Sequence, residues 1–106
     1  MKIPKDLIQE INKIVGQFNS KTYKKNEAKF IAEIKGSYLY LNREENGNIE
    51  SVVRLEYSGD LKNWIFAIFR YSTETFDDED TFFPGDEHID GTIEGALKAG
   101  SMAYPI

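Results

Sequence analysis

The fold is decided by one stretch of sequence, Ser51-Val-Val-Arg-Leu-Glu-Tyr-Ser-Gly-Asp-Leu-Lys-Asn-Trp-Ile-Phe-Ala-Ile-Phe-Arg-Tyr71. Its first part, residues 51–57, alternates between two faces with the period of two that is typical of a β-strand. Residues 58–60, Ser-Gly-Asp, then form a predicted turn, and residues 64–71 are apolar on both faces. Two extended segments with so short a connection predict neighbouring antiparallel strands.

Two further strands are predicted before this pair. Residues 28–35 alternate between an apolar set and a largely polar set, and residues 38–41 are apolar at every position. Gly36-Ser37 forms the turn between them, and Asn46-Gly47 is a strong short indication of a β-hairpin. The four segments together predict an antiparallel meander.

Helices are predicted near both ends of the chain. Residues 4–18 carry apolar side chains at a spacing of about 3.6 residues, which forms one helical face. Residues 92–99 predict a shorter helix, with Asp90 or Thr92 as its N-cap and Gly100 just past its end. Gly95 inside this helix indicates a close approach of its backbone to the sheet. The sequence therefore predicts a single α+β domain over residues 1–106: an N-terminal helix, a four-stranded antiparallel meander sheet, a long acidic loop and a short C-terminal helix.

Both faces of the predicted sheet need cover. Residues 38–41 and 64–71 are apolar on both faces, whereas a sheet open to water on one side would alternate cleanly. We expect the first helix on one face and the C-terminal third of the chain on the other. A homodimer through the sheet is the alternative.

Composition excludes several classes of protein. The chain has 106 residues, no Cys and a net charge of −5, which excludes a disulfide framework and a thiolate metal site. Its acidity argues against nucleic acid as the main partner, because phosphate binding needs positive potential. No apolar run approaches the roughly 20 residues of a membrane span, and the first residues do not resemble a signal peptide. We therefore expect a cytoplasmic protein.

The charge is unevenly distributed along the chain. Residues 1–35 carry eight Lys against four acids, whereas residues 73–106 carry one Lys against nine acids. Three Phe residues lie among these acids in residues 73–90, which we call the acidic loop. Large rings within acidic sequence favour a segment that packs and presents its charge. The leading hypothesis is a non-enzymatic binding module that uses this loop against a basic protein. A solvated loop, or self-association of the basic and acidic thirds, is the alternative.

The candidate binding residues belong to two groups. One comprises the acids of the loop with the only histidine, and the other is an aromatic cluster in which Arg54 and an arginine on the next strand flank a tryptophan. These residues are Asp77, Asp78, Asp80, Asp86, His88 and Asp90 in the first group, and Trp64 and Arg70 in the second. The alternative for the second group is a core tryptophan with arginines paired to acids.

An enzyme or a divalent-cation-dependent protein using His88 is the alternative function. Residues 86–94 partly match a calcium loop, but the match fails at position 12, where Leu97 replaces the bidentate glutamate. No dinucleotide or phosphate-binding glycine motif occurs, so we expect no cofactor and no metal site. A Lys-rich stretch at residues 21–30, with Tyr38 and Tyr40, offers a weaker alternative: a stacking surface for single-stranded nucleic acid.

Several motifs carry a family resemblance. They are residues 54–72, Phe82-Phe-Pro-Gly85, residues 91–100 and Ala103-Tyr-Pro105. On these motifs the chain resembles a small family of uncharacterised prokaryotic proteins, over about residues 36–106. The resemblance implies a small domain of unknown function and no catalytic residue.

Overall fold

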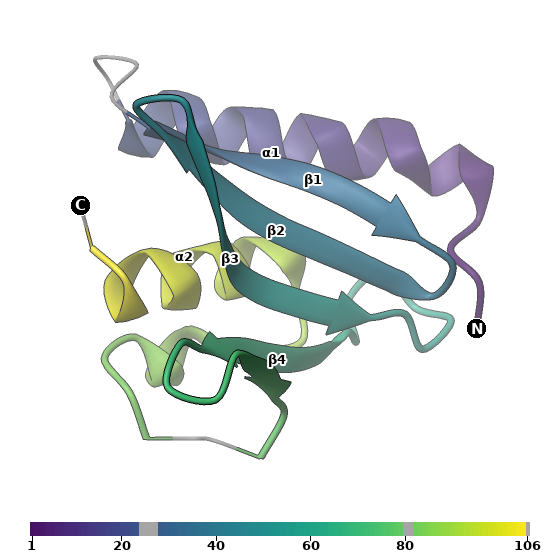
Figure 1. Ribbon diagram of the computed structural model, residues 1–106. Helices are drawn as coiled ribbons and strands as arrows, with labels where there is room; N and C mark the ends of the chain where they lie inside the picture. The colour runs from purple at the N-terminus through teal and green to yellow at the C-terminus, as the bar shows by residue number, and fades with distance from the viewer. Residues whose placement is uncertain (24–27, 80–81, 106) are drawn as a thin grey trace.

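The helices and strands occur in the predicted order, with one strand more than expected. The computed structural model describes residues 1–23, 28–79 and 82–105. The elements are a short 3-10 helix η1 (Lys5–Leu7), α1 (Ile8–Thr22), β1 (Ala28–Lys35), β2 (Tyr38–Glu45), β3 (Asn48–Glu56), β4 (Ile65–Arg70), β5 (Thr75–Asp77), a second 3-10 helix η2 (Asp86–His88) and α2 (Ile93–Ala103). The strands form one antiparallel sheet in the order β1-β2-β3-β4-β5 (Figure 1). The fold is therefore α+β, as predicted.

The prediction of four strands was wrong by one, because β5 lies within the acidic loop. Glu74 adopts a left-handed φ of 55°, which allows a tight turn after β4. Phe76 then pairs with Phe69 in the ladder, and their rings pack edge to face at 5.0 Å. This cross-strand ring pair stabilises a strand that its acidic sequence does not favour.

The first helix has its predicted length but lies four residues later, and the second is longer than predicted. The first ends at Thr22 instead of residue 18, since Gly16 faces solvent and Asn19 is held in the helix by hydrogen bonds to Phe30. The second ends at Ala103 and contains Gly100 in its interior. A Cβ at Gly100 would meet side-chain atoms of Val52 and Val53 at 2.9 Å, so this glycine lets the helix approach the sheet closely.

The two helices cover the same face of the sheet, which corrects the expected arrangement. Figure 1 shows α1 and α2 on one side of the strands, with α2 crossing β3. A register shift after Leu41 places a β-bulge at Val52, so that Val52 and Val53 both face α2. Among the described residues of the predicted cover for the second face, Phe76 packs there, and its ring lies 5.6 Å from that of Tyr40.

The hydrophobic core lies between the helices and the sheet. Its largest fully buried side chains are Phe30, Ile11, Leu39, Leu41, Leu55, Ile93, Leu97, Val52 and Val53. The opposite side of the sheet is called the open face. Strand alternation and register give its residues. They include Lys29, Ile31, Glu33 and Lys35 on β1, Tyr38, Tyr40, Asn42 and Glu44 on β2, Arg54 and Glu56 on β3, Ile65, Ala67 and Phe69 on β4, and Phe76 on β5.

Candidate functional site

The acidic loop is anchored to the sheet by two of its three phenylalanines. Phe76 packs on the open face, whereas Phe83 stacks on Phe66 on the helix face, with centroids 5.9 Å apart and planes inclined by 14°. The two anchors therefore lie on opposite faces of the sheet. Phe82, beside the second anchor, is 89% exposed. Such exposure is unusual for a phenylalanine and marks Phe82 as a candidate contact residue.

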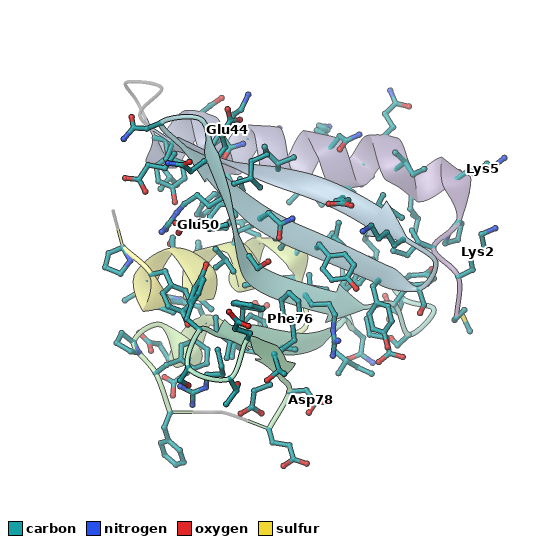
Figure 2. The ribbon with its side chains drawn as sticks, viewed as in Figure 1. Lys2, Lys5, Glu44, Glu50, Phe76 and Asp78 are labelled. Carbon is teal, nitrogen blue, oxygen red and sulfur yellow. The ribbon has the colours of Figure 1, made fainter. Side chains whose placement is uncertain are left out.

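The carboxylates between these anchors differ in their surroundings. The Asp77 side chain accepts a hydrogen bond from the Glu79 backbone N–H at 2.9 Å and lies 3.9 Å from Arg70 Nε. Asp78 and Glu79 are exposed, and Figure 2 shows Asp78 directed away from the sheet below Phe76. Asp80, another predicted binding residue, lies outside the described residues. The anchored segment thus presents at least two carboxylates to solvent.

His88 and Asp90 lie apart from these carboxylates and line a cavity. A cavity of about 520 Å³ between α1 and α2 is lined by both residues, together with Glu10 and Lys62 among others. The Asp90 carboxylate accepts hydrogen bonds from the Thr92 hydroxyl at 2.6 Å and from its backbone N–H at 3.0 Å, which lower the Asp90 pKa. Thr92 in turn caps α2 by accepting the Gly95 N–H. Asp86 lies in η2 and is not part of the cavity lining.

A metal centre does not form among the described residues. No group of three His, Asp or Glu side chains there could hold an ion. His88 has one close carboxylate, Glu87, with Nε2 3.7 Å from Oε1. The cavity can therefore accept a small polar molecule, but its described side chains do not provide a coordination shell.

Trp64 directly precedes β4 and Arg70 is its last residue, but the two do not form an exposed aromatic cluster. Trp64 is 4% exposed, donates its indole N–H to the Leu61 carbonyl at 2.8 Å and packs against Tyr57. Arg70 lies on the side of β4 that faces the helices, whereas Arg54 lies on the open face. Trp64 is therefore a core residue and Arg70 lies close to Asp77, as in the alternative given above. Arg54, by contrast, forms no ion pair with a described residue.

The structure reveals a different arginine cluster, which the sequence analysis did not resolve. The Arg54 guanidinium lies 4.8 Å from the ring centroid of Tyr38 and 5.2 Å from that of Phe76, within cation–π range of both. Tyr40 and Phe69 extend the row of rings across the open face. The apolar character of residues 38–41 and 64–71 on both faces was the only sequence feature that indicated this surface.

Another arginine, Arg43, is buried and has a structural role. Arg43 is 5% exposed and donates from Nη1 to the backbone carbonyl of Tyr104, the C-cap residue of α2. Burial raises the pKa of the nearby Tyr23, while the charge of Arg43 opposes that rise. A cation at the carbonyl end of a helix is favoured by the helix dipole, so Arg43 helps fix α2 to the sheet.

Comparison with protein-family models, curated proteins and solved structures finds no match to this chain. This result is consistent with the resemblance to an uncharacterised family of unknown function. None of the helices in the described ranges has the length and apolarity needed to cross a bilayer.

Proposed function

We propose that the protein is a non-enzymatic cytoplasmic binding module whose acidic loop binds a basic protein partner. The observation that carries this proposal is the anchoring of the loop at Phe76 and Phe83, because it holds the intervening charge in one place. A fixed cluster of carboxylates loses less conformational entropy on binding than a loose tail does. The partner would offer lysine or arginine side chains to Asp78 and Glu79.

Phe82 gives the proposed partner a second property. An exposed ring beside carboxylates fits a basic surface that also contains an apolar recess. The ring would supply affinity by leaving water, while the carboxylates would steer association and select positive partners. Binding of this kind weakens as salt rises, because the Debye length falls from about 30 Å at 0.01 M to about 8 Å at 0.15 M.

Replacing Phe82 by Ala is expected to weaken binding of a basic, apolar ligand about tenfold, or about 1.4 kcal/mol. The probe is a labelled peptide of alternating Lys and Leu, followed by fluorescence anisotropy at both salt concentrations. Ile49→Ala is the matched control, since Ile49 is 63% exposed and neighbours Glu50, which Figure 2 shows well apart from Asp78. Binding that ignores salt, or an equal loss in both variants, would contradict the proposal.

The cavity beside His88 supports one alternative, a cation-dependent protein or small enzyme that uses His88 with Asp86, Glu87 and Asp90. Its test is calorimetry with calcium, magnesium, manganese and zinc, comparing the native protein with His88→Ala. Heats equal in the two proteins would exclude it. A larger heat for the native protein would favour it over the binding module.

A further inference from the structure

The open face leaves apolar side chains in contact with water. No helix in the described ranges covers it, and both α1 and α2 pack on the other side. Ile65 on β4 is 49% exposed. Four more apolar or aromatic residues of this face are only half-buried: Ile31, Tyr38, Tyr40 and Phe69. Phe76 packs against Tyr40 and Phe69 on this face, and Ala67 is 1% exposed. The remaining rings and aliphatic side chains form the kind of surface that a partner covers.

The charges of this face balance one another. Its strands carry three cations, Lys29, Lys35 and Arg54, and three anions, Glu33, Glu44 and Glu56. Lys29 pairs with Glu44 at 3.8 Å, and Lys35 pairs with Glu33 at 3.0 Å. The chain as a whole has a net charge of −5, so its excess of negative charge lies elsewhere. Two acidic copies can therefore meet at this face without the repulsion that their acidic loops would cause.

The remaining two charges, Arg54 and Glu56, stand on the central strand of the five. Neither forms an ion pair with any residue in the ranges 1–23, 28–79 and 82–105. They point to the same face and are two positions apart in the sequence, or about 6.6 Å along the strand. When two copies of β3 stack antiparallel, with a two-fold axis between them at the level of Leu55, Arg54 of each copy stands opposite Glu56 of the other.

We propose that the open face is the contact between two copies of this chain. The two-fold axis lies between the two sheets, perpendicular to β3 and midway between the Leu55 backbones of the two copies. The two sheets would pack face to face about 10 Å apart, a distance that the long Arg54 and Glu56 side chains can span. The rings of Tyr38 and Phe76 hold the Arg54 guanidinium in position before the contact forms. Ile65, which pairs with Glu56 in the sheet, lies beside the axis and loses its exposed area.

Sedimentation velocity over a range of protein concentrations tests this contact. The native chain should show a concentration-dependent dimer, and Ile65→Asp should raise its dissociation constant at least tenfold, since it places a charge in the apolar part of the contact. Ile8→Asp is the control, because Ile8 is 37% exposed on α1, outside the open face. Circular dichroism confirms that each variant is folded. A monomer at every concentration, or equal weakening by both variants, would overturn the proposal.

A charge exchange tests the position of the axis. Arg54→Glu alone places like charges opposite one another in both pairs of the dimer, and Glu56→Arg does the same with the opposite sign. Each single variant should therefore dissociate at least tenfold more readily than the native protein. The double variant Arg54→Glu/Glu56→Arg restores opposite charges across the axis and should recover association. A double variant as weak as the single ones would contradict the pairing and with it the proposed dimer.

Discussion

Replacing Gly95 by Ala is expected to lower the free energy of unfolding by about 2 kcal/mol, although Ala favours a helix over Gly by about 1 kcal/mol. Gly95 lies in the first turn of α2 and is buried. A Cβ there would collide with the backbone carbonyl of His88 and the carboxylate of Asp90. A close approach at Gly95 was predicted from the sequence, but the expected neighbour was the sheet. The actual neighbour of Gly95 is the turn before the helix, and it is Gly100 that contacts the sheet.

The structure cannot relieve this collision without losing stability. The His88 carbonyl belongs to the backbone and cannot rotate away, and Asp90 can move only by giving up its two hydrogen bonds with Thr92. Those bonds position the N-cap of α2, so the helix start would loosen together with the wall of the cavity. Urea unfolding followed by far-UV circular dichroism measures the loss.

Gly16→Ala is the matched control for this prediction. Gly16 also lies inside a helix, but it faces solvent and a Cβ there would meet nothing within 4 Å. This variant should therefore gain about 1 kcal/mol from helix propensity alone. The two substitutions are chemically identical and opposite in expected sign. Stabilisation by both would show that the turn at residues 88–90 yields easily, contrary to the argument above.

Elements that depend on a pattern within one segment could be predicted from the sequence. The helical spacing of Ile11, Val15 and Phe18 predicted α1, although four residues too early, and the alternation of residues 28–35 placed β1 correctly. Each depends on periodicity within one segment. The fifth strand could not be found in this way. Its three residues, Thr75–Asp77, become a strand only through the ladder with β4 and the ring of Phe69.

The site was harder to predict than the fold. Alternation shows which residues share a face of a strand, but not which face the helices will cover. That choice depends on the bulge at Val52 and on the small residue Gly100, two features whose effect appears only when β3 and α2 meet. For the same reason Arg54 and Arg70 were expected to flank one aromatic surface, yet the register places them on opposite faces.

Asn19 of α1 completes the hydrogen bonding of the sheet edge. Its side-chain amide accepts the Phe30 backbone N–H at 2.8 Å and donates to the Phe30 carbonyl at 2.9 Å, as a neighbouring strand would. β1 is an edge strand, so these two backbone groups have no partner strand. A sheet edge with unpaired backbone groups is a site where a strand of another chain can bind. Asn19 blocks such binding at Phe30, the buried part of the edge.

Asn19→Ala is therefore expected to lower the free energy of unfolding by about 2 kcal/mol, because each unsatisfied group costs about 1–3 kcal/mol and water reaches this edge only in part. Asn12→Ala is the control: Asn12 is exposed on the same helix, and its change should stay within about 0.5 kcal/mol. Hydrogen exchange provides a local measurement, since the Phe30 amide should lose protection in Asn19→Ala well before the amides between β2 and β3. Equal stability and equal Phe30 exchange in the two variants would mean that the edge does not depend on Asn19.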